Sequence, residues 1–238
     1  MKTSLLTIRN MDAWYGDDKT KKKVLSGFSL ELAEHETVGL IGLNGAGKTT
    51  FLHILSGLHT GYRADDILFY GRPVTPRDRD FKLCRYSVFA EDSSFSCFTS
   101  REYLSFVFSA YGKKLSDVSE LVRGFHFESY MDVLLKDLST GSRKKAFLIT
   151  AFALQPRLLF LDEPVNGLDL QSTEYLYRQI AGYKEYGTVL FSSHILESIA
   201  LTSDRVFVLK DGKIRRTFEG GGTDAAGIRE ALRYENDL

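Results

Sequence analysis

The chain has little cysteine and no long apolar run. Its 238 residues include two cysteines, Cys84 and Cys97, which lack metal-ligand spacing and a neighbouring histidine cluster. We therefore expect free thiols, as in a reducing cytosol, and neither a disulfide scaffold nor a zinc site. The longest apolar run, Ala146–Leu154, is broken by Thr150 and is far too short to span a membrane. The N-terminus lacks the apolar core of a signal peptide, so any role at a membrane has to come through a partner.

Net charge is absent as well. The 31 basic and 31 acidic side chains cancel, so bulk electrostatics give no reason to expect a nucleic-acid partner. With 43% hydrophobic residues, the chain is long enough to bury a substantial core in one large or two small domains.

One local absence points to an anionic ligand. Residues 37–64 contain no Asp or Glu, although a chain of this composition would place about three or four there. Inside this stretch, residues 42–50 read Gly-Leu-Asn-Gly-Ala-Gly-Lys-Thr-Thr, which matches the phosphate-binding P-loop G-x-x-x-x-G-K-[ST]. Helix starts otherwise favour acidic residues, so their absence fits an incoming polyanion.

The P-loop carries a defined chemistry. Its glycines let several backbone N–H groups point at one phosphate, and Lys48 is expected to reach the β- and γ-phosphates. Thr49 is expected to place its hydroxyl on Mg²⁺. The alternative, a glycine turn without a ligand, is disfavoured because a strand pattern precedes the loop and a helical pattern follows it. The predicted nucleotide-binding residues here are Gly42, Asn44, Gly45, Ala46, Gly47, Lys48, Thr49 and Thr50.

Two more apolar segments end in reactive side chains. Leu158–Leu161 is followed by Asp162 and Glu163, and Thr188–Ser193 is followed by His194. Ligands of parallel α/β sheets bind at the carboxyl ends of strands, so we expect these sets to meet the P-loop at one nucleotide. The first carboxylate is predicted to hold Mg²⁺ and the second to orient or deprotonate the attacking water. The alternatives are an exposed strand-end loop and a structural histidine.

A basic helix start is a further candidate. Ser139 is predicted to cap a helix over residues 139–154, whose first turns carry Arg143, Lys144 and Lys145. Because these cations oppose the helix dipole, we favour an anion docking there over side chains that reach into solvent. Upstream, residues 100–111, 115–124 and 130–135 are predicted to be helical, which indicates a helical subdomain over about residues 92–138.

Together these motifs resemble the ATP-binding subunit of an ABC transporter, over about residues 4–219. Residues 42–50 resemble Walker A, 158–163 Walker B with the catalytic glutamate, 138–142 the signature and 166–169 the D-loop, while His194 resembles the switch histidine and Tyr15 the aromatic residue that stacks on adenine. The pattern is most similar to single-domain subunits of bacterial ABC-2-type exporters.

The resemblance implies an α/β fold. A P-loop NTPase cassette of this family has a mainly parallel RecA-like core sheet, an N-terminal antiparallel β subdomain and a helical subdomain. Residues 1–219 would form a single ATPase domain, with the helical subdomain at about 92–138 continuing into the helix 139–154. Residues 220–238 would form a glycine-rich break and a C-terminal helix.

It also implies a mechanism. Two subunits pack head to tail around two ATP molecules, each γ-phosphate held by Lys48 of one copy and by Ser139 and Gly141 of the other. Glu163 and His194 would be catalytic, Asp169 would belong to the D-loop, and Thr49, Asp162 and Glu91 would serve Mg²⁺. The partners implied are an integral membrane permease and a second copy or a related ATPase subunit, with no nucleic acid. The chain would be cytoplasmic and peripheral on the inner face of the cell membrane, which it would contact only through the permease.

Two departures from the family pattern keep other functions open. Glu91 stands where the family's Q-loop has glutamine, and Thr140 and Ser142 replace a glycine and a glutamine of the strict signature. A carboxylate adds charge near the phosphates and does not donate hydrogen bonds unless protonated. The alternatives are a non-transport ABC ATPase and an ATP-gated regulatory module with little turnover. The intact Glu163 argues against the second.

Overall fold

A six-stranded, mainly parallel sheet forms the centre of the computed structural model, which describes residues 3–17, 20–89, 92, 94–196, 199, 202–219 and 225–233. Its strand order is β11-β10-β3-β9-β8-β7, and only the β10–β11 pair is antiparallel. The strands are β3 (Thr37–Ile41), β7 (Arg85–Val88), β8 (Leu158–Leu161), β9 (Thr188–Ser193), β10 (Arg205–Lys210) and β11 (Lys213–Glu219).

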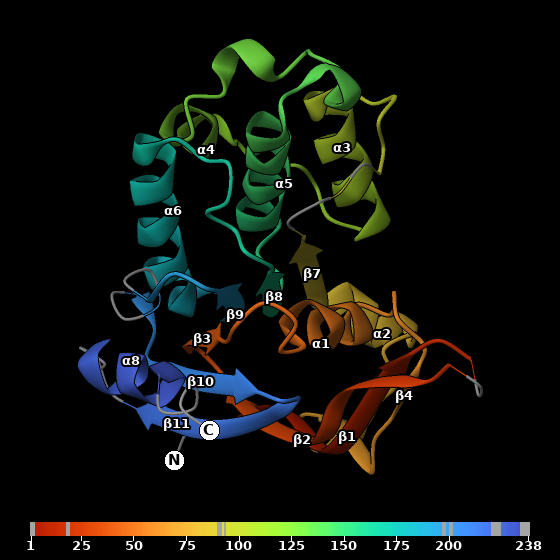
Figure 1. The fold of residues 1–238 in the computed structure, drawn as a ribbon. Helices are drawn as coiled ribbons and strands as arrows, with labels where there is room; N and C mark the ends of the chain where they lie inside the picture. Colours follow the sequence, from red (N-terminus) through yellow and green to blue (C-terminus); the bar gives the residue numbers. More distant parts are fainter. Residues whose placement is uncertain are drawn as a thin grey trace.

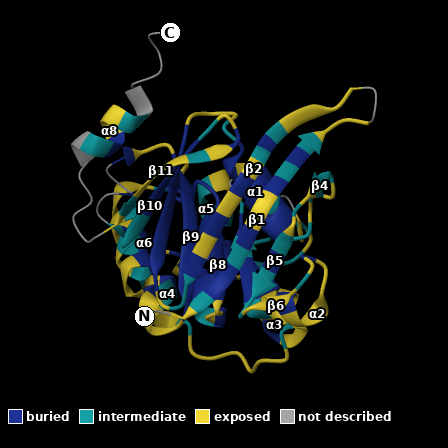
Figure 2. Cartoon of the chain, turned by 90° about the horizontal axis from the view of Figure 1, so that it is seen from below, coloured by how far each residue is buried: buried dark blue, intermediate teal, exposed yellow. Residues whose placement is uncertain are grey.

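A second, antiparallel sheet lies beside it. Burial alternates along much of β1 and β2, because one face packs inward and the other meets solvent (Figure 2). This sheet contains β1 (Ser4–Tyr15), β2 (Lys22–Ala33), β4 (Tyr62–Arg63), β5 (Asp66–Phe69) and β6 (Arg72–Pro73).

The central sheet separates two hydrophobic cores. On β8, Leu159 and Leu161 face the core shared with the long helices, whereas Leu158 and Phe160 face the core shared with α1 and the antiparallel sheet. This explains the unbroken apolar sequence of that strand, since side chains on both faces are buried. In Figure 1, α1 accordingly lies over the antiparallel sheet.

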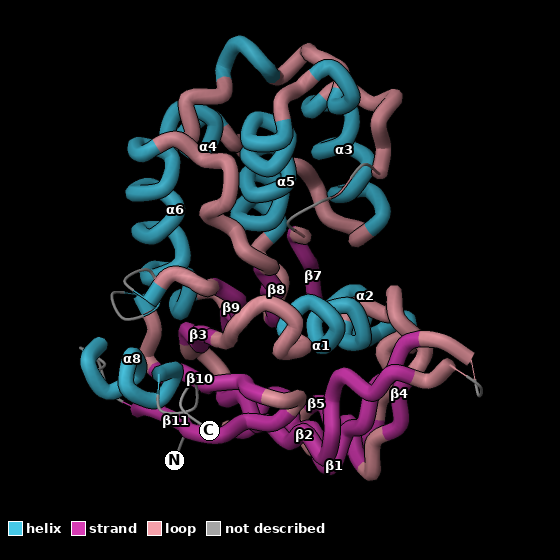
Figure 3. The backbone as a smooth tube through the Cα atoms, in the orientation of Figure 1, coloured by secondary structure: helices cyan, strands magenta, loops and turns pink. Residues whose placement is uncertain are grey.

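The longer helices gather at the end of the molecule away from the antiparallel sheet (Figure 3). A capping box between Thr99 and Glu102 fixes the start of α3. None of the described helices has both the length and the apolar character needed to cross a membrane. The helices are α1 (Lys48–Leu55), α2 (Arg79–Cys84), α3 (Ser100–Ala110), α4 (Ser119–Gly124), α5 (Thr140–Leu154), α6 (Leu170–Gly182) and α8 (Ala225–Arg233), with 3₁₀ turns η1 (Glu128–Tyr130), η2 (Leu135–Asp137) and η3 (Tyr183–Glu185).

The helix expected over residues 130–135 is wrong. Leu134 forms a β-bridge with Thr99, and the backbone N–H of Leu135 donates to the carbonyl of Phe98. These long-range bonds use groups that a helix would have paired internally, so a turn and a single bridge residue join two short 3₁₀ turns here. The helix expected over 115–124 begins only at Ser119, whose N–H donates to the Asp117 carboxylate.

Candidate functional site

The P-loop connects β3 to α1 and closes around its own lysine. Gly45 and Gly47 have φ angles of 82° and 109°, the left-handed region that favours glycine, and Gly47 is the residue from which α1 starts. The ammonium of Lys48 donates to the carbonyl of Gly42 at 2.7 Å. The first turn of α1 contains no acidic residue, so its free N–H groups favour an anion.

A pocket of about 540 Å³ opens over this loop, which is large enough for a nucleotide. Every P-loop residue predicted from 44 to 50 lines it, while Gly42 contributes its carbonyl to Lys48. The lining residues are Tyr15, Lys22, Val24, Asn44, Gly45, Ala46, Gly47, Lys48, Thr49, Thr50 and Glu163.

Glu163 links two of the expected motifs directly. One carboxylate oxygen lies 3.6 Å from the Lys48 ammonium, and the other lies 2.7 Å from Nδ1 of His194. The side chain is buried, and the residue has a φ of 46°, which is strained for a residue with a side chain. Its side chain lines the P-loop pocket.

Asp162 lies beside it and is held from two sides. Its two carboxylate oxygens accept hydrogen bonds from the hydroxyls of Thr49, at 2.9 Å, and Ser192, at 2.6 Å. Ser192 also accepts the backbone N–H of Glu163 at 2.9 Å, so one β9 hydroxyl orients both acids. This role of Ser192 was not predicted from the sequence, although a serine just before the end of a buried strand is a visible signal.

These neighbours suit a small, hard cation. A carboxylate and a hydroxyl oxygen in mutual contact are the kind of ligands that Mg²⁺ takes from proteins, the remainder coming from water and substrate phosphates. The described residues contain no group of three His, Cys, Asp or Glu side chains that could hold a metal by themselves. Glu91, the third expected Mg²⁺ residue, lies outside the described residues.

Two of the three basic side chains at the start of α5 turn inward. The Lys144 ammonium is buried and donates to the carbonyls of Glu163, at 3.0 Å, and Asn166, at 2.8 Å. Burial lowers the pKa of Lys144, while the charges of Asp162 and Glu163 act in the opposite direction. The Lys144 ammonium therefore stabilises the strained backbone of Glu163 and does not face an external anion.

Lys145 is also turned inward. Its ammonium donates to the carbonyl of Phe125 at 3.0 Å and to the Asp169 carboxylate at 2.6 Å. The hydrogen bond from Lys145 holds the pKa of Asp169 well below its usual range, and Asp169 in turn caps α6 through the N–H of Ser172. Two of the three cations behind the docking prediction are thus internal.

The remaining signature residues lie elsewhere. Ser139 is exposed at the start of α5, where its hydroxyl accepts the N–H of Ser142 at 3.1 Å. Gly141 lies against the backbone of Gly167, because a Cβ added to Gly141 would be 2.0 Å from the Gly167 carbonyl oxygen. Neither Ser139 nor Gly141 is among the residues that line the P-loop pocket of the same chain.

Tyr15 forms the far wall of the pocket. Its hydroxyl lies 3.3 Å from that of Thr50, and its ring centroid is 4.5 Å from that of His59 at an interplanar angle of 48°. His59 follows α1 and is fixed by a 2.9 Å hydrogen bond between Nε2 and the carbonyl of Trp14. His59 was not predicted from the sequence, because a single histidine after a helix forms no recognisable pattern.

Comparison with known proteins agrees with these features. The statistical model of the ABC transporter family matches residues 25–166. The chain is 33% identical, over 92% of its length and 93% of the relative's, to the putative ABC transporter ATP-binding protein AlbC of Bacillus subtilis. It is 33% identical to a Nod factor export ATP-binding protein I of Burkholderia orbicola, covering 90% of this chain and 70% of that one.

Other relatives broaden the picture. The spermidine/putrescine import ATP-binding protein PotA of Spiroplasma citri is 30% identical, covering 91% of this chain and 62% of that one. Among solved structures, one described as the ATP-binding subunit of an ABC transporter superposes with a TM-score of 0.80 at 27% identity, covering 96% and 94% of the two chains.

Lys144 provides the first test of the site. We expect Lys144→Met to lower the kcat of ATP hydrolysis about tenfold or more, because small displacements of a catalytic group are costly, while the Kd for ATP changes less than about threefold. Lys144→Arg, which keeps a long cationic donor, should recover part of the rate. Arg143→Met removes a neighbouring charge that has no contact with Glu163 among the described residues, and should leave kcat unchanged. Equal losses in the two methionine variants would contradict a positioning role.

His59 provides the second test. If it holds the ring of Tyr15 for the base, His59→Leu should weaken ATP binding about three- to tenfold, as expected for an aromatic contact of about 0.5–1.5 kcal/mol. Binding of inorganic tripolyphosphate, which has no base, should not change. Tyr15→Ala should have a similar effect, and the double variant should add little to it. Titration calorimetry measures the binding of ATP and of tripolyphosphate to each variant. If His59→Leu weakens the binding of both ligands equally, His59 only supports the P-loop.

Proposed function

The chain belongs to the ABC transporter family as an ATP-binding subunit, and from this premise we propose that its P-loop pocket holds ATP and Mg²⁺ for hydrolysis by Glu163. Members of this family are ATPases that dimerise and power membrane transport together with permease subunits. The observation that carries the residue assignment is the carboxylate of Glu163, which faces both Lys48 and His194 inside the pocket.

The contacts support a sequence of events. Lys48 neutralises Glu163 before ATP arrives, and a γ-phosphate competes for the same ammonium. Once released from Lys48, Glu163 remains held by His194 and accepts a proton from the water that attacks the γ-phosphorus, as the bond to the ADP oxygen breaks. Thr49 and Asp162 would hold Mg²⁺, which would supply charge stabilisation at the phosphates.

A second copy completes the proposed site. The start of α5 is exposed at Ser139 and lies outside the pocket of its own chain, so its hydroxyl and the nearby N–H groups are available to a phosphate on another copy. We assign Ser139 and Gly141 to this contact and place Asp169 of the D-loop beside the same surface. We also retain Glu91 as a residue that serves Mg²⁺ or water.

A surface for the permease is proposed on the helical subdomain. Phe95 and Phe106 are 41% and 45% exposed, and their rings lie 5.3 Å apart, with Phe98 in contact with both. An exposed cluster of aromatic rings is typical of a protein-binding surface. This surface fits the proposed division of the chain into one ATPase domain over residues 1–219, with a helical subdomain over about 92–138 continuing into the helix 139–154, and a C-terminal segment over 220–238.

We propose that the transporter exports its substrate. We also propose that the chain is cytoplasmic and bound peripherally at the inner face of the cell membrane. Export is favoured by the resemblance to ABC-2-type subunits and by the similarity to a Nod factor export protein. Import is the second candidate, because a relative named for spermidine and putrescine import is nearly as similar. Inside-out vesicles that contain the whole complex would accumulate substrate with ATP in an exporter, and would lose preloaded substrate in an importer.

Glu163→Gln tests the catalytic assignment. Because the amide cannot take the proton of water, we expect turnover to fall about 10²- to 10⁴-fold. ATP affinity should rise, since the carboxylate no longer competes for Lys48. Removal of Mg²⁺ with EDTA should abolish the turnover of the unaltered protein. If Glu163→Gln hydrolyses ATP at the original rate, the general base lies elsewhere.

The same variant tests the shared site. ATP-loaded Glu163→Gln should elute as a dimer on gel filtration, because it binds without hydrolysing. Adding Ser139→Arg should return it to a monomer, since a bulky cation at the start of α5 fills the space that the partner's phosphate needs. Ser129→Arg is the matched control, because Ser129 is also exposed but lies in η1. A dimer that persists with Ser139→Arg would exclude the head-to-tail arrangement.

Phe106→Asp tests the permease surface. A charge placed among the exposed rings should prevent co-purification with the permease and its stimulation of ATP turnover, while the turnover of the isolated subunit stays the same. Leu83→Asp, on the exposed side of α2, is the control and should bind the permease normally. Normal assembly of Phe106→Asp would move the contact to another surface.

A further inference from the structure

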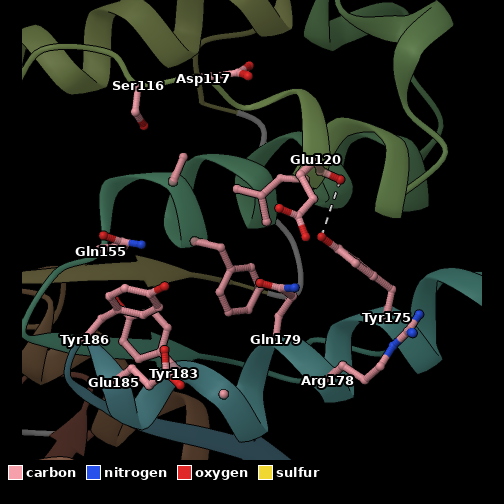
Figure 4. Close-up of a pocket in the computed structure, with 14 residues that line it drawn as sticks. Ser116, Asp117, Glu120, Gln155, Tyr175, Arg178, Gln179, Tyr183, Glu185 and Tyr186 are labelled. Carbon is pink, nitrogen blue, oxygen red and sulfur yellow. Dashed lines mark hydrogen bonds between the residues drawn. The ribbon is translucent and has the colours of Figure 1, made fainter.

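A second pocket lies away from the P-loop, where α4, the end of α5, α6 and η3 meet (Figure 4). Its volume is about 350 Å³, and it shares no lining residue with the P-loop pocket. Ser116, Asp117 and Glu120 form one side, and Tyr183, Glu185 and Tyr186 form the opposite side. Nothing in the proposed mechanism uses this pocket.

Aromatic rings form one wall of the pocket. Phe152 and Tyr183 meet edge to face with centroids 6.0 Å apart, and Tyr183 meets Tyr186 in the same way at 6.1 Å. The Tyr183 hydroxyl donates to the carbonyl of Pro156 at 2.7 Å, which fixes its ring. Tyr186 is half exposed at the edge of this fixed wall. The pocket is therefore preformed and offers a ring to a ligand.

The charges around the pocket are unbalanced. Among the described residues that line it, Asp117, Glu120 and Glu185 are acidic and only Arg178 is basic. The carboxylates of Glu120 and Glu185 have no ion pair or hydrogen bond within the described part of the chain. Asp117 accepts hydrogen bonds from Ser119, which lower its pKa and keep it ionised.

Nearby cations cancel only part of this charge. Lys113 donates to the carbonyl of Leu154 at 2.6 Å and so caps the C-terminus of α5. Lys184, in η3, lies 2.9 Å from the carboxylate of Asp204. Arg178 lines the pocket and offsets one of its three acidic charges, with its guanidinium over the ring of Tyr175, 5.5 Å from the centroid. The last turn of α6 has no basic residue, so its C-terminus adds partial negative charge on this side.

We propose that this pocket binds a small organic cation, an ammonium or amidinium group on a flat or aliphatic body. The cation would pair with Glu120 and Glu185, and its body would lie against Tyr186. A neutral ligand would gain nothing from the charges of Glu120 and Glu185, which are both exposed, and an anion would be repelled. The volume of the pocket is near the lower end for ligand sites, which suits a compact molecule.

Benzamidinium and benzamide test the charge requirement, because they share a shape and differ in charge. We expect benzamidinium to bind the full-length protein with a Kd of about 1 mM or tighter, and benzamide to bind at least tenfold more weakly. Titration followed by NMR of the protein gives both constants. Saturating ATP should leave the constants unchanged, since the two pockets share no residue. Equal binding of the two compounds, or displacement of benzamidinium by ATP, would overturn the proposal.

Variants locate the bound cation. Glu120→Gln and Glu185→Gln should each weaken benzamidinium binding about fivefold or more, and Tyr186→Ser should also weaken it. Glu128→Gln removes an exposed carboxylate of the same region outside the pocket, and should have no effect. Unchanged ATP turnover in each variant shows that the fold is intact. Full affinity in both pocket glutamine variants would place the cation elsewhere and overturn the assignment.

Discussion

The contact between Glu163 and Lys48 connects the parts of the site that lie far apart in the sequence. The lysine comes from the P-loop after β3, the glutamate from the end of β8, and His194, on the other carboxylate oxygen, from the end of β9. These three strands are neighbours in one parallel sheet, so their carboxyl ends place the side chains within a few ångströms. The sheet order is therefore what makes the chemistry possible.

The same contact imposes an electrostatic constraint. Lys48, Lys144, Asp162 and Glu163 are all buried, and each isolated charge of this kind costs several kcal/mol to take out of water. This cost is offset because Lys48 contacts a backbone carbonyl and the Glu163 carboxylate, and Lys144 donates to two backbone carbonyls. Asp162 accepts hydrogen bonds from two hydroxyls, and Glu163 contacts His194. Under the proposed function, an arriving phosphate would change this balance, because it would give Lys48 a stronger partner and release Glu163. The charges of the site compensate one another without a ligand, and a bound phosphate would rearrange these contacts.

The sequence predicted what local patterns determine. Apolar runs identified β3, β8 and β9, and the glycine spacing identified the P-loop, so the residues that gather around the pocket could be named in advance. The direction of a long side chain is not determined by local patterns, because it depends on which groups from distant parts of the chain lie nearby. Lys144 and Lys145 turn inward since carbonyls of Glu163 and Phe125 lie within reach, and no spacing rule contains those distant partners. The cation pocket between α4 and α6 is equally invisible in the sequence, because its walls are joined only by the fold.

Ser139 and Gly141 belong to the same signature motif, but their substitution would have different effects. Gly141 fits against the Gly167 carbonyl of its own chain, so any side chain there would displace the D-loop before a second copy was involved. Its replacement would therefore damage the isolated subunit and the dimer alike. Ser139 contacts only Ser142 through its hydroxyl among the described residues, and it is exposed. A substitution at Ser139 would therefore act mainly on a molecule that binds at this surface, so Ser139 tests the proposed shared site more cleanly than Gly141 does.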